Sequence, residues 1–288
     1  MRTSLSRVLF SGILITLSGV GLSSCSSFPG QGTELSRKQI EQGARQGDAE
    51  SQYRLGLVYT NDARPDHKQA TMWFRRSADQ GNRDAQYMLG INYLAGKGVE
   101  RDLSSARIWF QQAADQGQAN AQYQLGEIYI NGRGVPVEQD WAARWYGKAA
   151  EQQHTEAQFS LGVAFARGLG LPINWVRACQ WLLLAEKSEH ALAPALREKV
   201  CGELSAAKWE RAQRLADRWK PTRRTFYKDP PTVRYIQMKL QQLRFYSGYI
   251  DGVYGDQTRE ALERYQAGLG EDLIPELNEG LLERLRKG

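Results

Sequence analysis

Few residues of this 288-residue chain have the types and spacing that catalysis or metal binding requires. Its histidines, His67, His154 and His190, fall in a predicted inter-helix turn, at the start of a repeated unit and in a hairpin turn. The sequence contains no zinc-protease, thiol-redox, serine-hydrolase or phosphate-loop motif. Its carboxylates recur at helix starts and on exposed helix faces, where such side chains are usually solvated. The sequence therefore predicts no enzyme, no catalytic residue, no metal site and no cofactor.

The residues best placed to contact a ligand lie near the C-terminus, in a tight turn between two predicted helices. The first helix covers residues 232–244 and is amphipathic, because one face carries Val233, Ile236, Leu240 and Leu243. A glycine-rich turn follows from Phe245 to Gly255, and a second helix runs through Gln266.

This order of helix, turn and helix resembles the small three-helix peptidoglycan-binding module, whose signature the chain matches through Gln266. Beyond that point Asp-Leu-Ile-Pro at residues 272–275 replaces the family's second Asp-Gly turn. The resemblance implies that ligand contacts come from the Asp-Gly-x-x-Gly loop and the start of the next helix. The candidate peptidoglycan-binding residues are Tyr249, Asp251, Gly252, Tyr254, Gly255, Thr258 and Arg259.

Both a binding role and a structural role fit several of these residues. A ligand made of glycan and stem peptide needs aromatic faces, backbone donors and hydroxyl groups in a shallow groove. Gly252 and Gly255 can equally serve the turn alone, because glycine adopts positive φ at little cost. Thr258 can instead cap the helix, and Tyr254 can belong to the core.

Most of the chain before this domain consists of a unit of 36 residues, written most clearly at 81–116 and 117–152. Tryptophans follow the same period: Trp73, Trp109, Trp145 and Trp181. Within the first unit the apolar spacing predicts helices over 83–95 and 103–115, separated by a Gly-x-Gly break. Gly90 recurs as Gly56, Gly126 and Gly162, which indicates close helix packing. One such pair cannot bury its aromatic face alone, so the pairs must stack as a solenoid.

The pattern A-Q-Y-x-L-G-x-x-Y, G-x-G-V and A-x-x-W-(F/Y) resembles the Sel1-like repeat, a relative of the tetratricopeptide repeat. The resemblance covers residues 47–188 and four repeats, of which the first is two residues short between Gly56 and Asp66. The predicted fold is therefore all-α: an α/α solenoid of Sel1-like helix-turn-helix repeats and a small three-helix peptidoglycan-binding-like domain.

The N-terminal segment, residues 1–25, resembles a bacterial lipoprotein signal peptide. Arg2 and Arg7 make the start of this segment basic. The apolar run Val8–Leu22 that follows is too short to span a membrane in the mature protein. Leu22-Ser23-Ser24-Cys25 resembles a lipobox, which implies acylation of Cys25. Ser26 follows Cys25, and the resemblance implies that the absence of Asp at this position favours transport to the outer membrane. The alternative is an ordinary signal peptide with an incidental cysteine.

The remaining segments complete the predicted domain order. Residues 26–35 form a flexible tether, and residues 36–219 contain the solenoid with capping helices at both ends. Cys179 and Cys201 lie about equally far from the predicted turn near 188–190, so a helical hairpin brings them together. An oxidising periplasm favours a disulfide between them, and two buried free thiols are the alternative. Residues 220–231 form a basic linker, and residues 232–288 form the C-terminal domain.

A net charge of +6, without a long Lys/Arg run that includes aromatic residues, does not indicate nucleic-acid binding. Together the resemblances imply a non-enzymatic lipoprotein anchored in the outer membrane and facing the periplasm. It would bind peptidoglycan through its C-terminal domain and one or more envelope proteins through its repeats. One alternative is an assembly factor of an envelope export or surface-polymer machine. The other is an accessory regulator of a cell-wall-remodelling enzyme.

Overall fold

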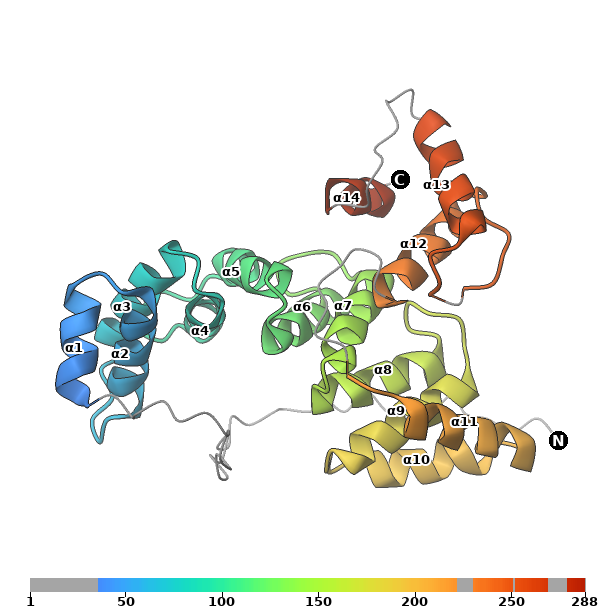
Figure 1. Cartoon of the computed structure of the whole chain (residues 1–288), viewed down its shortest axis with the longest axis horizontal. Helices are drawn as coiled ribbons and strands as arrows, with labels where there is room; N and C mark the ends of the chain where they lie inside the picture. The colour runs from blue at the N-terminus through green and yellow to red at the C-terminus, as the bar shows by residue number, and fades with distance from the viewer. Residues whose placement is uncertain (1–35, 222–229, 251, 269–278, 288) are drawn as a thin grey trace. The chain divides into compact units, whose positions relative to one another are not determined.

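The computed structural model describes residues 36–221, 230–250, 252–268 and 279–287, which form helices, turns and loops without a strand (Figure 1). The predicted signal peptide, Cys25, the tether, residues 222–229 of the linker and Asp251 lie outside the described residues. The helices of the array, our name for residues 36–219, are α1 (Arg37–Arg45), α2 (Ala49–Asn61), α3 (His67–Asp79), α4 (Arg83–Ala95), α5 (Leu103–Asp115), α6 (Ala119–Asn131), α7 (Gln139–Glu151), α8 (Thr155–Arg167), α9 (Trp175–Lys187), α10 (Ala193–Gly202) and α11 (Ala206–Arg218). The C-terminal domain contains α12 (Pro230–Gln242), α13 (Asp256–Gly268) and α14 (Glu279–Lys287).

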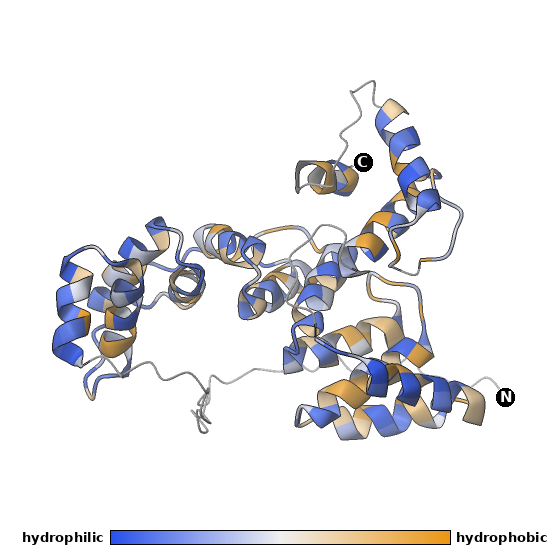
Figure 2. Cartoon of the chain, viewed as in Figure 1, coloured by the Kyte–Doolittle hydropathy of each residue, from blue (hydrophilic) through white to orange (hydrophobic). Residues whose placement is uncertain are grey.

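Helices α2 to α9 form four successive pairs, and each pair packs against the next. Helices α4 and α5 have the bounds predicted from the sequence. Hydrophobic and hydrophilic residues share each helix of the array, as expected for helices that bury one face (Figure 2). The structure therefore confirms the all-helical repeat fold.

A glycine in the first helix of each pair lies against a large side chain of the second helix. A Cβ atom at Gly90 would lie 2.7 Å from the ring of Phe110, and one at Gly126 would lie 2.5 Å from the ring of Tyr146. Leucine takes this place in the fourth pair, where Leu182 faces Gly162. Glycine in a helix interior costs roughly 1 kcal/mol relative to alanine. Close contact with the facing side chain offsets that cost, which explains why the glycine recurs.

The periodic tryptophans lie in the second helices, where three are buried and one is half-buried. Trp145 is fully covered, and Trp73 and Trp181 are nearly so. Trp109 is half-buried and packs against a core cluster that contains Phe74 of the preceding repeat and Leu89 of its own repeat. The tryptophans thus have comparable positions in successive repeats, as a stacked array requires.

A buried glutamine in each first helix connects neighbouring pairs. Gln122 donates from Nε2 to the carbonyl of Ala114 at 3.0 Å and accepts from Gln152 Nε2 at 2.7 Å. It therefore links the end of α5 to the end of α7. Equivalent bonds from the buried glutamine to the preceding repeat are made by Gln52, Gln86 and Gln158.

Additional helices close both ends of the array. At the N-terminal end α1 begins with the predicted capping box of Ser36 and Gln39. At the other end α10 and α11 pack on α9. Cys179 of α9 and Cys201 of α10 form a disulfide with 5.4 Å between their Cα atoms.

The C-terminal domain is built on α12, whose Val233, Ile236 and Leu240 are fully buried. Helix α12 packs against α13 and α14, and also against α7 of the array. It starts two residues before the predicted Thr232, because proline is tolerated in the first turn of a helix. Among the described helices, none combines the length and the apolarity that crossing a bilayer requires.

Candidate functional site

The buried side chain of Gln237 holds the loop between α12 and α13 in place. Its Oε1 accepts a hydrogen bond from the backbone N–H of Gly252 at 2.9 Å. Its Nε2 donates to Thr258 Oγ1 at 3.1 Å and to the carbonyl of Val253 at 3.2 Å. Gln237 is 1% exposed, so these bonds form where water cannot compete.

Tyr246 and Gly252 shape the same loop. The hydroxyl of Tyr246 donates to the carbonyl of Tyr249 at 2.9 Å, and the Tyr246 side chain is buried. Gly252 has φ of 81°, a left-handed conformation that favours glycine, and its N–H points to Gln237. Helix α12 therefore positions residues 249, 250 and 252–255, which we call the candidate loop.

The structure separates the predicted ligand residues into exposed and buried groups. Tyr249 is 91% exposed, and Val253, which is not among the predicted residues, is 62% exposed. Gly255 and Arg259 are also exposed, and Arg259 pairs with Asp256 at 2.8 Å. Exposed aromatic and aliphatic side chains of this kind can cover the face of a sugar ring or a peptide methyl group.

The other predicted residues contribute mainly to the domain itself. Thr258 is 1% exposed and bonds to Gln237, and Gly252 is buried in the turn. Tyr254 is half-buried, and this burial, with a smaller contribution from Glu263, raises the pKa of its hydroxyl. These three residues hold the loop in shape. Asp251 lies outside the described residues.

Sequence reasoning missed Gln237 and Tyr246, which position the loop without facing a ligand. A signal for Gln237 was present: it is a polar residue within the apolar face formed by Val233, Ile236 and Leu240. A buried polar side chain requires partners, so a glutamine at this place indicates a local hydrogen-bond network.

A second candidate surface lies on the first helices of the repeats. Half-buried aromatic rings recur there at Tyr53, Tyr87, Tyr123 and Phe159. Beside the last two is a pocket of about 250 Å³, lined by Glu127, Tyr146, Phe159 and Ser160 among others. Tyr146 donates to Glu127 at 2.7 Å, and burial, then the charge of Glu127, raises the pKa of its hydroxyl. This surface offers aromatic rings and a carboxylate to a protein chain.

Two histidines have structural partners in the array. His154 stacks on Tyr123 and its Nδ1 accepts from the backbone N–H of Ala157 at 3.2 Å, which caps α8. His190 stacks on Phe159 with ring centroids 4.1 Å apart. Within the described ranges, no group of three or more His, Cys, Asp or Glu side chains could bind a metal ion.

Comparison with protein families assigns both parts of the chain. The Sel1 repeat family matches residues 49–82, 83–118, 119–154 and 155–190, which are the four helix pairs. The family described as "Putative peptidoglycan binding domain" matches residues 229–270, which include α12, the candidate loop and α13. No curated protein matches the chain.

Two solved structures are similar to the chain. A Sel1 repeat protein from Oxalobacter formigenes shares 32% identity over 57% of this chain and 48% of its own, with a TM-score of 0.53. A protective antigen of uropathogenic Escherichia coli strains, described as displaying an SLR fold, shares 29% identity over 82% of this chain and 49% of its own, with a TM-score of 0.57. The chain thus spans about half the length of each. With the repeat packing and the helical C-terminal domain described above, these matches identify the chain as a Sel1-repeat protein with a C-terminal domain of the peptidoglycan-binding family.

Proposed function

We propose that the chain is a non-enzymatic lipoprotein of the outer membrane, facing the periplasm, which connects peptidoglycan to a protein partner. The observation that best supports wall binding is the candidate loop, where Tyr249 and Val253 are exposed above the buried network of Gln237. Exposed aromatic residues on a prearranged backbone reduce the ordering cost of binding. The family of this domain points to the same ligand class.

The mechanism is tethering. Acyl chains on Cys25 would anchor the N-terminus in the membrane, and the C-terminal domain would bind the wall. Burial of an acyl chain contributes about 0.8 kcal/mol per methylene, so several chains give a stable anchor. Two attachments within one chain raise the effective concentration of each, and weak wall binding is then sufficient.

The proposal has two separable tests. Purified sacculi should retain the intact chain on sedimentation, and failure to do so would remove the wall-binding part. Membrane fractionation in a diderm host, where C25S should move the protein from the membrane to the soluble fraction, tests the anchor. An unchanged distribution of C25S would remove the lipoprotein part and leave wall binding intact.

The array supplies the protein-binding surface, because Sel1 repeats suggest protein–protein interaction and the aromatic rings of the first helices are only half-buried. Crosslinking in cells with a photoreactive residue at Ser160, which lines the pocket, should capture the partner. Capture of export or surface-polymer components would favour the assembly-factor alternative, whereas capture of a wall hydrolase would favour the regulator. Lysis of wall material by the chain alone in a zymogram would overturn the non-enzymatic assignment.

A further inference from the structure

The outer face of α7 differs from the same face in the first two repeats. Trp141 and Arg144 are buried, with exposed fractions of 0% and 2%. Their counterparts, the residues one or two 36-residue periods earlier, are exposed or half-buried: Gln69 and Ser105 for Trp141, Met72 and Ile108 for Arg144. Something therefore covers α7 that does not cover α3 or α5.

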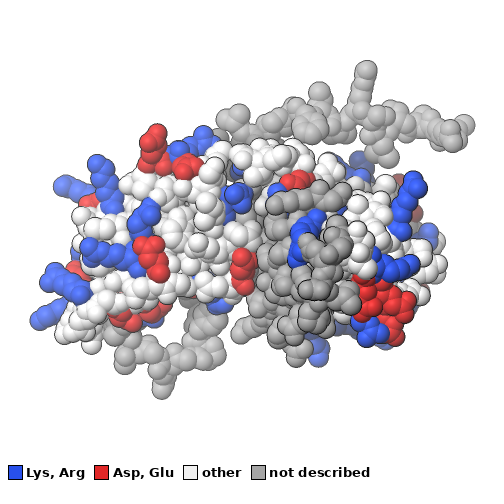
Figure 3. All heavy atoms as spheres, turned by 90° about the horizontal axis from the view of Figure 1, so that it is seen from above, with Lys and Arg blue, Asp and Glu red and all other residues white. Residues whose placement is uncertain are grey.

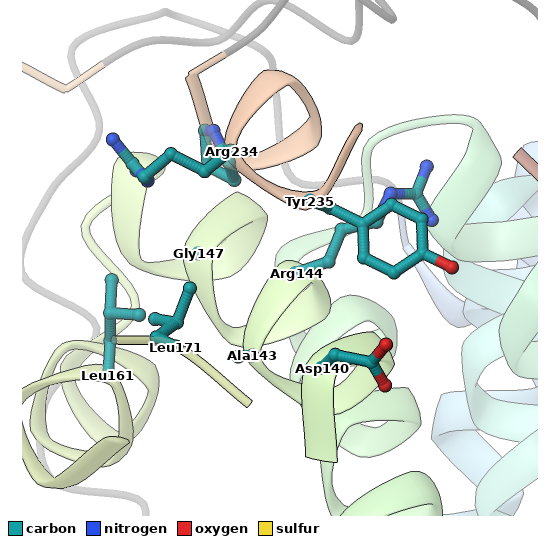
Figure 4. Close-up of a pocket in the computed structure, with 9 residues that line it drawn as sticks. Asp140, Ala143, Arg144, Gly147, Leu161, Leu171, Arg234 and Tyr235 are labelled. Carbon is teal, nitrogen blue, oxygen red and sulfur yellow. The ribbon is translucent and has the colours of Figure 1, made fainter. Parts of the chain in front are cut away.

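The cover is α12 of the C-terminal domain. Tyr235 is 1% exposed and meets the Trp141 ring with centroids 4.8 Å apart, in an edge arrangement. The Arg144 guanidinium lies 4.5 Å from the ring centroids of both Trp141 and Trp145. Figure 4 shows Tyr235 and Arg144 side by side at the junction of the two helices. Aromatic and cation–π contacts of this kind are strongest when water is excluded.

Gly147 makes room for this contact. Its counterparts are Arg75, Gln111 and Leu183, so the repeat itself does not need a glycine here. A Cβ atom at Gly147 would lie 2.6 Å from Cβ of Pro231, at the start of α12. Glycine weakens a helix interior relative to alanine, and the approach of α12 explains why it is present.

Three carboxylates of α7 and its N-cap face three basic side chains of the C-terminal domain. Asp140 pairs with Lys239 at 2.5 Å, and Glu151 lies 4.0 Å from Arg234. Arg286 of α14 binds Glu138 through two nitrogens. The paired side chains are only 11–21% exposed, so solvent screens these pairs less than surface ion pairs.

Glu138 forms an ion pair with the C-terminal domain instead of capping its own helix. Its counterparts Asp66, Asp102 and Asn174 each accept a hydrogen bond from the backbone of the helix that they cap. Glu138 makes no such bond and pairs with Arg286 instead. Asp140 is also particular to this repeat, because the counterpart positions hold Lys68, Ser104 and Val176.

We propose that the outer face of α7 is a docking surface for α12 and α14 of the same chain, so that the array and the C-terminal domain act as one body. Residues 36–288 form a single compact unit. Glu151 contacts Arg234 and accepts a hydrogen bond from the indole N–H of Trp219. Trp219 precedes the linker and Arg234 follows it, so segments before and after the linker meet at one side chain, which favours docking within one chain. Tyr249 and Val253 remain exposed in this arrangement, so docking leaves both side chains accessible to a ligand.

A zero-length carbodiimide crosslinker tests docking in the intact chain. It joins an amine to a carboxylate that already touch, so Lys239 should become linked to Asp140. Lys187 and Asp217, in contact at 2.7 Å within the array, provide an internal control. Mixing chains that carry two different isotopic labels distinguishes crosslinks within one chain from crosslinks between two chains. Links within one label support the proposal, whereas links between labels, or a control link alone, overturn it.

Variants test whether the surface is specific. G147Q installs the residue of the second repeat. A helix tolerates glutamine at this position, but its side chain would clash with Pro231. The variant should therefore lower the yield of the Lys239–Asp140 crosslink about tenfold or more relative to the control link. Q111R, which installs the first repeat's residue at the matched position, should leave the yield unchanged. E138R should lower the yield and E138R/R286E should restore it. An unchanged yield in G147Q, or no recovery in the double variant, would contradict a dedicated docking surface.

Discussion

Single buried glutamines stabilise both parts of the molecule, and each bonds to backbone groups at a helix end or in a turn. In the array Gln122 connects the end of α5 with the end of α7. In the C-terminal domain Gln237 bonds to Gly252 and Val253 of the candidate loop and to the flanking Tyr246 and Thr258. A buried amide of this kind stabilises the fold only when its partners are in place.

Replacing Gln122 by leucine should destabilise the array. The substitution removes the buried amide that bonds to the Ala114 carbonyl and leaves the half-buried Gln152 amide without its acceptor, which costs about 1–3 kcal/mol. Urea unfolding followed by circular dichroism should show a lower midpoint for Q122L. The control is Q112L at an exposed position of α5, for which a drop of equal size would refute the bridging role.

Replacing Gln237 by leucine should weaken wall binding while the helices remain. The loop loses the acceptor for Gly252 N–H and the donor to Thr258, so its backbone is no longer fixed. Retention of Q237L by sacculi should fall about tenfold, the effect of losing one or two net hydrogen bonds. Q241L, on an exposed position of the same helix, should be retained like the parent chain. Equal retention of Q237L would show that the loop does not bind the wall.

At the scale of helices, the 36-residue period predicted most of the array. Helices α4 and α5 matched in both bounds, because glycine breaks and helix-capping carboxylates recur in the sequence. The recurring glycine was correctly linked to close packing, but the sequence did not show its partner, which is the large side chain after the tryptophan: Phe110 for Gly90 and Leu182 for Gly162. The period of the sequence does not show which residue of the neighbouring helix packs against the glycine.

The docking surface on α7 could not be predicted in the same way. Trp141, Gly147 and Asp140 are visible in the sequence as departures from the repeat. Their partners, however, lie on α12, far along the chain, and no local pattern connects the two. The same holds for the candidate loop, where motif residues were found but the division into exposed Tyr249 and buried Thr258 depends on tertiary packing.

Capping of α8 by His154 predicts a pH dependence. Burial lowers the pKa of His154 despite the opposing effect of Glu156, so the folded state prefers neutral imidazole. The unfolded chain then binds the proton more readily, and stability falls as pH drops through the ordinary histidine range. Protonation of Nδ1 would also remove the bond from Ala157 N–H.

Melting temperatures at pH 7 and pH 5 test this prediction. The parent chain should lose more stability than H154N, since asparagine can cap a helix without titrating. Burial also lowers the pKa of His190, so H190N serves as a second comparison that leaves the α8 cap in place. A pH response in H154N as large as that of the parent chain would assign the effect to other groups.

For the whole molecule, the two candidate binding surfaces lie on a single compact unit beyond residue 35. Basic and acidic side chains are interspersed over the face seen in Figure 3, so contacts to partners would depend on local shape as well as charge. If α7 fixes the C-terminal domain on the array, a partner bound to the first helices would keep a constant position relative to the wall bound at the candidate loop. Such an adaptor would set the orientation of its partner at the wall as well as its distance.

Wall binding by the intact chain is decided by co-sedimentation with purified sacculi over a range of wall concentrations. The variant Y249A/V253A removes the two exposed side chains of the candidate loop, and V137A removes a similarly exposed valine elsewhere. We expect saturable retention of the parent chain and of V137A, and retention at least about tenfold weaker for Y249A/V253A. Equal retention of all three proteins, or of none, would contradict binding of peptidoglycan through this loop.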